Sequence, residues 1–380
     1  MSEFLILIPC LLNGGTEIQT LHLAKVLMDC HKTVKVLCFF ESDQNIINDF
    51  NKIGAEVVLL DFNRRIFFVD FIIKLKRTLK LFHPTIVHIQ YMAPGALPII
   101  AARLAGIEKI FATVHQPWTY SHGLLARIIL RVASLLTTKF IAVSLNAEKS
   151  WFGSATLYNE KRSLKSQPHH FTIHNAINTA EIDQILARTN PSQIKQDLNI
   201  STEKVIIGSI SRLRKEKGVD ILLDAFSQLV DQNKNIHLVI IGTGPDEDDL
   251  KAKVIEAGCQ NQVSFYGQTK WGHAMELLSI IDIVVVPSRF EGFGLTAAEA
   301  MAAEKPVIAS DTTGLKEVVI DHETGILFSV GNVSALVLAL QELVIDPDLR
   351  YRYGLAGKKR VTQYFSSEIF TNKITALYND

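Results

Sequence analysis

Short apolar runs alternate with amphipathic stretches along the whole chain, and this alternation restricts the possible folds more than any other feature. In the first half, the runs 4–8, 34–40, 57–60, 86–89, 110–114 and 140–143 have the length and composition of buried parallel strands. The stretches between them have helical periodicity, as in 19–30. A strand–helix–strand rhythm of this kind predicts an α/β fold with a doubly wound sheet.

The rhythm repeats in the second half. After a strand at 171–174, a turn at 175–178 and a helical linker at 182–198, further strands are predicted at 205–209, 236–241, 263–265, 283–286 and 306–309. A chain of 380 residues is also too long for one ordinary core. We therefore predict two Rossmann-like domains, 1–180 and 181–365, with a C-terminal helix over 366–380 packing back on the first. Two such domains are expected to face a central cleft, at the carboxyl ends of their strands.

Composition excludes several classes of protein. With 48% hydrophobic and 21% charged residues, the chain is neither disordered nor of low complexity. Its four cysteines are far apart and form no CxxC pair, so no disulfide framework or zinc site is expected. The N-terminus lacks the basic region of a signal peptide, and no uninterrupted apolar stretch reaches 18 residues, so a cytoplasmic protein is expected. The basic residues are not interleaved with aromatics, which argues against a nucleic-acid partner.

The net charge of zero hides an asymmetry between the halves. Residues 1–180 carry a net charge of +7 and residues 181–380 carry −7. Within the first half, 63–83 combines six cations and one acid with apolar residues at 68, 71, 72, 75 and 79, a helical spacing. Such a helix can lie on an anionic bilayer, which would place the protein at the inner face of the membrane. The alternative is a crossover helix that buries the same residues against the first sheet.

The most informative segment is 289–302, RFEGFGLTAAEAMA, which follows the strand at 283–286 and begins a helix. Its two glycines let the backbone approach a ligand, and the helix start offers free N–H groups to a phosphate or sugar hydroxyls. Glu291 lies in the loop and Glu299 inside the helix, so the two reach different parts of one ligand. Glu299 can accept hydrogen bonds from the two hydroxyls of a ribose. As isolated residues they could equally be a turn residue and a surface residue.

A second cationic segment, SRLRKEKG at 211–218, directly follows the strand at 205–209. Arg212 and Lys217 at the end of a strand can bind a diphosphate, and neutralising a leaving diphosphate is what sugar transfer requires. A charge run of this kind can also be a solvated surface.

Three further features are weaker. The loop Asn13-Gly14-Gly15-Thr16-Glu17 and the turn at 242–245 both lack the full G-x-G-x-x-G pattern, although the backbone near Gly15 can still contact a phosphate or sugar. His115 follows the strand at 110–114, where it would face the expected cleft or form part of a satisfied core.

Together these segments resemble the family-four group of retaining GT-B glycosyltransferases. Gly14-Gly15-Thr16-Glu17 is similar to the GGxE segment of that family, Val114-His115 to its sugar-contacting histidine and Ile141-Ala142-Val143-Ser144 to the segment before its linker. Arg212…Lys217-Gly218 resembles the phosphate-binding segment and Glu291…Glu299 the signature E-x7-E. The match extends in order over most of the chain.

The resemblance implies a retaining hexosyltransferase that moves a sugar from a nucleotide-diphosphate sugar to a glycan or lipid-linked acceptor, as in cell-surface polysaccharide or lipopolysaccharide synthesis. The acceptor is expected in the first domain and the donor in the second, with no metal and no other cofactor. The residues implied in catalysis are His115 and Glu291, and those implied in donor binding are Gly15, Arg212, Lys217, Phe293, Gly294, Leu295 and Glu299.

Two departures from the family pattern and several alternatives stay open at this point. The chain has Asn175-Ala176-Ile177-Asn178 where Asn-Gly-Val-Asp is common, and the segment 153–170 has no assigned role. The alternatives are another GT-B enzyme (a sugar-nucleotide epimerase or a phosphorylase), a nicotinamide oxidoreductase, for which neither glycine turn supplies the full pattern, and a non-catalytic nucleotide-sugar-binding module.

Overall fold

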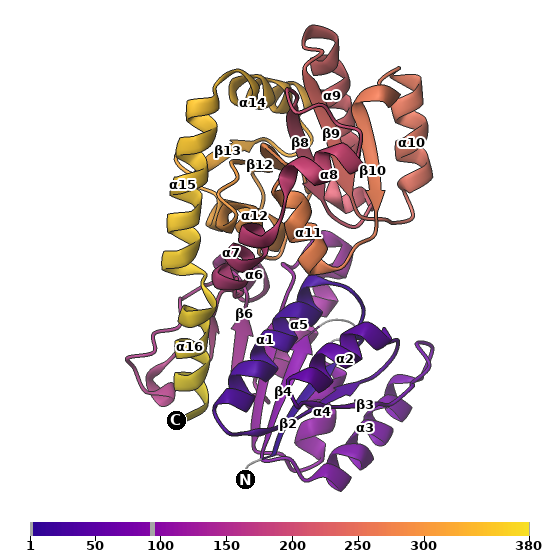
Figure 1. Cartoon of the computed structure of the whole chain (residues 1–380). Helices are drawn as coiled ribbons and strands as arrows, with labels where there is room; N and C mark the ends of the chain where they lie inside the picture. Colours follow the sequence, from indigo (N-terminus) through magenta and orange to yellow (C-terminus); the bar gives the residue numbers. More distant parts are fainter. Residues whose placement is uncertain (1–2, 92–95, 380) are drawn as a thin grey trace. The chain divides into compact units, whose positions relative to one another are not determined.

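The computed structural model describes residues 3–91 and 96–379, and these form two compact units (Figure 1). Unit 1 comprises Met1–Ala176 and Ser367–Asp380, and unit 2 comprises Ile177–Ser366. Each unit is built around one parallel sheet with helices on both faces, as expected for the alternating sequence pattern.

The sheet of unit 1 has seven strands in the order β3-β2-β1-β4-β5-β6-β7, all of them parallel. The strands are β1 (Glu3–Ile8), β2 (Thr33–Cys38), β3 (Glu56–Leu59), β4 (Ile86–Tyr91), β5 (Lys109–Val114), β6 (Lys139–Ala142) and β7 (His170–Thr172). The chain adds strands outward from β1 on one side and then from β4 on the other. The direction of winding therefore reverses between β1 and β4, and this reversal is the switch point of the sheet.

Helices cover both faces of this sheet. They are α1 (Gly15–Asp29), α2 (Gln44–Lys52), α3 (Phe68–Phe82), α4 (Leu97–Leu104), α5 (Gly123–Ser134), α6 (Leu145–Phe152) and α16 (Ser367–Asn379). Alternate residues of β1 point to opposite faces. Phe4 and Ile6 pack in the core with α1, α2 and α16, whereas Leu5 and Leu7 pack in the core with α3, α4 and α5.

The sheet of unit 2 has six parallel strands in the order β10-β9-β8-β11-β12-β13, so its switch point lies between β8 and β11. The strands are β8 (Val205–Ile210), β9 (Ile236–Ile241), β10 (Val263–Gly267), β11 (Ile283–Val286), β12 (Val307–Ser310) and β13 (Gly325–Phe328). The helices are α7 (Thr179–Arg188), α8 (Pro191–Asp197), α9 (Val219–Gln232), α10 (Glu247–Glu256), α11 (Trp271–Leu278), α12 (Leu295–Ala302), α13 (Leu315–Val318), α14 (Val333–Ile345) and α15 (Pro347–Tyr364).

Several element boundaries differ from the sequence-based predictions. Strand β13 was not predicted, because it begins with Gly325 and has only three apolar residues after it. The predicted linker helix over 182–198 is two helices, since Asn190 caps a new helix by accepting from the N–H groups of Ser192 and Gln193. The first helix begins at Gly15 and not at residue 19.

The segment 63–83 forms α3, and its apolar stripe is mostly buried. Phe71, Leu75 and Leu79 are at most 1% exposed and belong to the core beneath the sheet, while Phe68 is largely exposed. The helix is therefore a crossover helix between β3 and β4, the alternative raised by the sequence. Among the described helices, none combines the length and apolar character needed to cross a bilayer.

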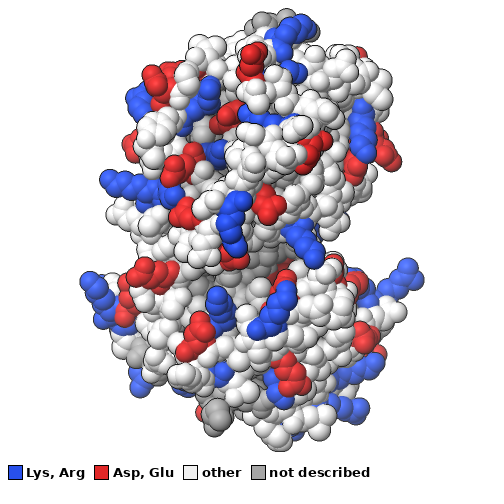
Figure 2. Space-filling model, in the orientation of Figure 1, with Lys and Arg blue, Asp and Glu red and all other residues white. Residues whose placement is uncertain are grey.

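The charge asymmetry between the halves does not collect into one patch on the face seen in Figure 2. Basic and acidic side chains are interspersed over both units there. The net +7 of residues 1–180 therefore gives no single-sign field on this face.

Candidate functional site

Two loops leave the sheet of unit 2 at its switch point. The loop 211–218 follows β8, and the loop 287–294 follows β11. The strands are paired directly, with Ile283 opposite Ile207, so both loops start at the same edge of the sheet. This edge is where open α/β sheets bind their ligands, and it carries most of the sequence-predicted donor residues.

The first loop is held by close backbone packing. Leu213 is buried and its N–H donates to Thr243 O at 2.9 Å. Gly218 ends the loop with φ +67°, and a Cβ there would lie 2.0 Å from Pro287 O. Glycine is therefore required on both counts. Within this loop Arg212 is exposed and Lys217 half-buried.

Lys217 and Glu291 connect the two loops. The ammonium Nζ of Lys217 lies 2.5 Å from Glu291 Oε1, and their side chains are only 27% and 17% exposed. Ser288 Oγ donates to the same carboxylate oxygen at 3.1 Å. An ammonium has three donor hydrogens, so Lys217 can hold Glu291 and still donate to a phosphate oxygen.

The cation of the second loop, Arg289, is engaged elsewhere. Arg289 donates two hydrogen bonds to the carboxylate of Asp220, at 2.9 and 2.7 Å. The ion pair raises the pKa of Arg289, and the guanidinium is committed to the framework.

The segment Phe293–Leu295 can contact a ligand through its backbone rather than through its side chains. Phe293 is 2% exposed and its ring packs edge-on against Phe365 at 5.2 Å. Gly294 has φ +102°, which favours glycine, and Leu295 is the first residue of α12. The N–H groups of this helix start have no partner within the helix. They can donate to a phosphate or to sugar hydroxyls.

The neighbouring loop supports this segment. Thr313 Oγ1 donates to Glu291 O at 2.5 Å, and Gly314 N–H donates to the same oxygen at 3.2 Å. A Cβ at Gly314 would lie 2.5 Å from Phe293 Cα, so only glycine allows the two loops to approach this closely. The backbone around Glu291 is fixed by these contacts.

Glu299 lies within α12 and accepts a hydrogen bond from a neighbouring helix. The indole N–H of Trp271, the first residue of α11, donates to Glu299 Oε1 at 2.7 Å. Burial raises the pKa of Glu299 to about 7, and the hydrogen bond from Trp271 partly opposes that shift. Trp271 was not predicted, although a carboxylate placed on a packed helix requires a donor nearby.

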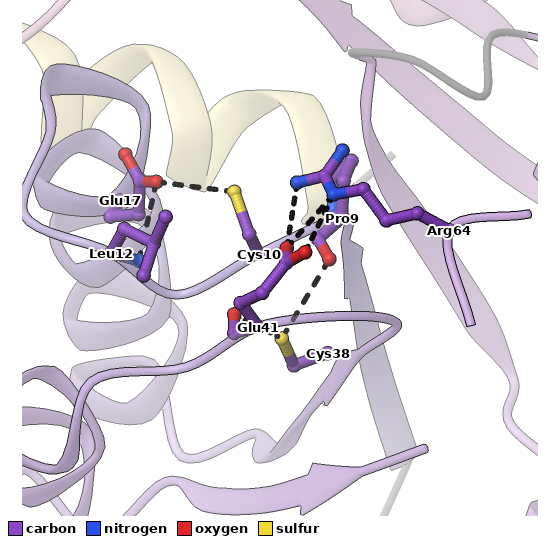
Figure 3. A network of polar contacts seen from close by, with 7 residues as sticks. All are labelled: Pro9, Cys10, Leu12, Glu17, Cys38, Glu41 and Arg64. Atoms are coloured by element: carbon purple, nitrogen blue, oxygen red, sulfur yellow. Dashed lines mark hydrogen bonds and ion pairs between the residues drawn. The ribbon is translucent and has the colours of Figure 1, made fainter. Parts of the chain in front are cut away.

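In unit 1, Gly15 is the first residue of α1, at the carboxyl end of β1 and beside the switch point. Two contacts of the Glu17 side chain hold the loop before it, as Figure 3 shows. Glu17 Oε1 accepts from Leu12 N–H at 3.4 Å and lies 3.6 Å from Cys10 Sγ. Glu17 is 4% exposed, so this glutamate of the GGxE segment braces the loop from inside.

His115 follows β5 and is almost buried. Its Nε2 lies 2.6 Å from Gln90 Oε1, the carbonyl oxygen of a buried residue on β4. Burial lowers the pKa of His115 to about 4, so its imidazole is neutral at ordinary pH. Since Nε2 then carries the hydrogen donated to Gln90, Nδ1 is left as an acceptor. Both side chains line a small cavity of about 30 Å³ in unit 1.

Gln90 was missed at the sequence level, although a signal was present. His88 and Gln90 are two apart on a strand that is otherwise apolar, so both point to one face and need partners there. His88 finds them in Thr113, at 2.7 Å, and in the hydroxyl of Tyr378 on α16.

The turn Asn175–Asn178 adopts ordinary geometry despite its unusual sequence. None of its four residues has a positive φ, so Ala176 is accommodated where glycine is common. The amide of buried Gln19 pairs with the backbone of Ala176, and Asn178 caps α7 by accepting from Glu181 N–H.

With this geometry described, the chain can be compared with known proteins. The family model Glycosyltransferase Family 4 matches residues 13–181, and Glycosyl transferases group 1 matches residues 191–360. Together the two models cover nearly the whole chain, which belongs to the group 1 glycosyltransferases of GT-B fold.

Its relatives include enzymes of cell-surface glycan synthesis. It is 32% identical over 183 residues to the lipopolysaccharide core biosynthesis mannosyltransferase LpcC of Rhizobium leguminosarum bv. viciae, covering 46% of this chain and 50% of that protein. It is 28% identical to the GDP-mannose-dependent monoacylated alpha-(1-6)-phosphatidylinositol monomannoside mannosyltransferase of Corynebacterium glutamicum, covering 74% and 73%. For several curated relatives, the matched region spans only about half of their length.

Solved structures confirm the fold. Anabaena Alr3699/HepE, determined with UDP and glucose, has a TM-score of 0.81 at 19% identity and is matched over 99% of this chain and 98% of that one. A glycosyltransferase from Rickettsia africae has a TM-score of 0.78 at 21% identity, over 100% and 99%. The predicted GT-B architecture of two Rossmann-like domains is confirmed by these neighbours and by the two sheets.

Proposed function

We propose that this glycosyltransferase moves a hexose-type sugar, with retention of configuration and without a metal, from a nucleotide-diphosphate sugar to a glycan or lipid-linked acceptor. The supporting observation is the Lys217–Glu291 pair, which connects the two loops at the switch point of unit 2. The names of the relatives support a role in capsular, lipopolysaccharide or glycolipid synthesis. Peripheral contact with an anionic membrane, at its cytoplasmic face, belongs to the same proposal.

In this proposal unit 2 binds the donor. Arg212 and Lys217 bind the diphosphate, Glu299 accepts hydrogen bonds from the ribose hydroxyls, and the backbone of Phe293, Gly294 and Leu295 contacts phosphate or sugar. The two cations take over the role that a metal has in other transferases, because they neutralise the charge that develops as the sugar departs.

Unit 1 binds the acceptor, and His115 and Gly15 contact the donor from that unit. The neutral His115 imidazole accepts a hydrogen bond from a sugar hydroxyl through Nδ1. Glu291 orients the sugar and stabilises the positive charge at its anomeric carbon.

The reaction follows a front-face course. The bond from the anomeric carbon to the diphosphate oxygen breaks, and its electron pair stays with the diphosphate. The acceptor oxygen forms its bond on the same face, and its proton passes to the departing phosphate oxygen. Configuration at the anomeric carbon is thereby retained.

The test follows donor turnover by proton NMR with UDP-, GDP-, ADP- and TDP-sugars in excess chelator, first with water as acceptor. We expect one donor to release a sugar whose first-formed anomer matches that of the donor. An inverted product would contradict retention. Binding without release would identify a non-catalytic module, an isomerised sugar nucleotide would identify an epimerase, and visible absorption of a bound pyridoxal group would identify a phosphorylase.

A further inference from the structure

The most apolar exposed surface of the described chain lies on α5 of unit 1 and the two residues after it. We call it the α5 ridge, and its members are Leu124, Leu125, Ile128, Ile129, Val132, Leu135 and Leu136. Six of the seven side chains are between 47% and 73% exposed, and Leu136 is 36% exposed. Single exposed apolar residues are ordinary, but a contiguous set marks an interaction surface.

The ridge is a continuous side of the helix. Successive members are one or three residues apart, and alternate ones are mostly four apart, the spacing of a single helical face. The opposite side carries Leu130 and Ala133, which are at most 4% exposed and belong to the core against the sheet. The helix therefore exposes more large apolar side chains to solvent than it buries.

Cations border the ridge. Arg127 and Arg131 lie on α5, and each donates through Nε to Trp151 O, at 3.0 and 2.6 Å. Arg127 also stacks over the ring of Trp118 at 4.9 Å. These contacts hold the two guanidinium groups beside the apolar side chains. No Asp or Glu occurs between Glu108 and Glu148, so no carboxylate of this stretch offsets them.

We propose that the α5 ridge inserts into the headgroup and acyl boundary of an anionic phospholipid bilayer. An apolar side with basic flanks and no acids is typical of helices that lie in that boundary. A second copy of the chain fits this surface less well. Two facing ridges would bring their own arginines together, and α5 has no carboxylate to pair with them.

A neighbouring helix adds to the surface. Helices α3 and α5 pack in the same core on one face of the sheet, each in contact with α4. At the start of α3, Phe67 and Phe68 are stacked and are 69% and 59% exposed. Further along the exposed side of α3 lie Arg77 and Lys80. This layer thus presents apolar and basic side chains from two helices.

Lipid binding by the α5 ridge does not require the proposed function. Only its use depends on that function, because a lipid-linked acceptor would reach the enzyme from such a surface. Binding of the ridge to lipid does not depend on sugar transfer. Vesicle binding and donor binding can therefore fail separately.

The experiment compares the full-length protein with the Ile128→Gln/Val132→Gln variant in co-sedimentation with vesicles. Phosphatidylglycerol–phosphatidylcholine vesicles and pure phosphatidylcholine vesicles are used at low and high salt. We expect the wild type to pellet with the anionic vesicles and much less with the neutral ones or at high salt. The double variant should lose about tenfold or more of its partitioning, because both exchanged side chains would leave the apolar phase.

Leu338→Gln is the matched control, since Leu338 is 66% exposed on α14 of unit 2. It should pellet like the wild type, and both variants should keep the wild-type thermal shift with nucleotide sugar. The proposal is overturned if the wild type stays in the supernatant with both vesicle types, or if the double variant pellets as well as the wild type. A wild-type dimer that becomes monomeric on Ile128→Gln/Val132→Gln, without vesicle binding, would identify a second copy as the occupant.

Discussion

Trp271 donates its indole N–H to Glu299 Oε1 at 2.7 Å, which leaves the other carboxylate oxygen and the remaining lone pairs for a ligand. Trp271 begins α11 and Glu299 lies in α12, so the pair fixes the carboxylate relative to two helices. The arrangement fits a group that is set in place before a ribose arrives.

Removing the Glu299 carboxylate should weaken donor binding more than it slows turnover, because the ribose takes no part in bond breaking. For Glu299→Ala we expect a loss of about ten- to a hundredfold in donor affinity, the range for a hydrogen bond to a charged group. Isothermal titration with the donor measures it. Trp271→Phe, which removes only the N–H donor, should have a smaller effect. Unchanged affinity in Glu299→Ala would mean that the ribose binds elsewhere.

Donor affinity should also depend on pH through Glu299. Its pKa of about 7 lies above the ordinary value for glutamate, and the proton competes with the ribose hydroxyls for the carboxylate. Affinity should therefore rise between pH 6 and pH 8, by about tenfold if only the ionised form binds. Trp271→Phe should move the midpoint to higher pH, because the hydrogen bond that lowers this pKa is gone. A pH-independent affinity in the wild type would contradict the assignment.

Arg212→Ala and Lys217→Ala should each weaken donor binding and, in addition, lower turnover sharply, because charge accumulates on the diphosphate as the sugar leaves. We expect kcat to fall about a hundredfold or more in each. Arg214→Ala is a suitable control, since Arg214 is exposed on the same loop and approaches Glu216 only at 3.8 Å. Wild-type activity should survive excess EDTA. Loss of activity that Mg²⁺ or Mn²⁺ restores would refute a metal-free reaction.

Gln90 should act through His115 as a positioning residue. Gln90→Ala leaves the Nε2–H of a buried imidazole without an acceptor and should reduce kcat by about five- to a hundredfold with little change in KM for the donor. Gln90→Glu places a carboxylate beside the ring and should raise the pKa of His115 from about 4. A new acidic limb should then appear in the pH profile of kcat. A purely structural role predicts no such limb.

The order of elements could be predicted from the sequence because parallel strands buried on both faces leave long apolar runs. Strands β9 and β11 match their predicted limits to the residue. Strand β13 was missed because Gly325–Phe328 begins with a glycine and has only three apolar residues, and pairing with β12 decides their conformation.

The candidate site was predictable where charged residues directly follow a strand in the sequence. The loops after β8 and β11 can be assigned from Arg212, Lys217 and Glu291, since the carboxyl ends of parallel strands share an edge. Partners far apart in the sequence could not be found this way. Trp271 and Glu299 are 28 residues apart, and Gln90 and His115 are 25 apart. Only the folded sheet brings such pairs together.

The central claim is that unit 2 binds a nucleotide-diphosphate sugar through Arg212 and Lys217. A thermal-shift panel of UDP-, GDP-, ADP- and TDP-sugars on the wild type and on the Arg212→Ala/Lys217→Ala double variant tests it most directly. At a ligand concentration a hundred times Kd, binding stabilises by about 2.7 kcal/mol, which corresponds to a rise of about 5–10 °C in Tm for a unit of this size. We predict such a rise with the sugars of one nucleotide in the wild type and little or none in the double variant. No shift with any of the four in the wild type, or an equal shift in the double variant, would contradict the account.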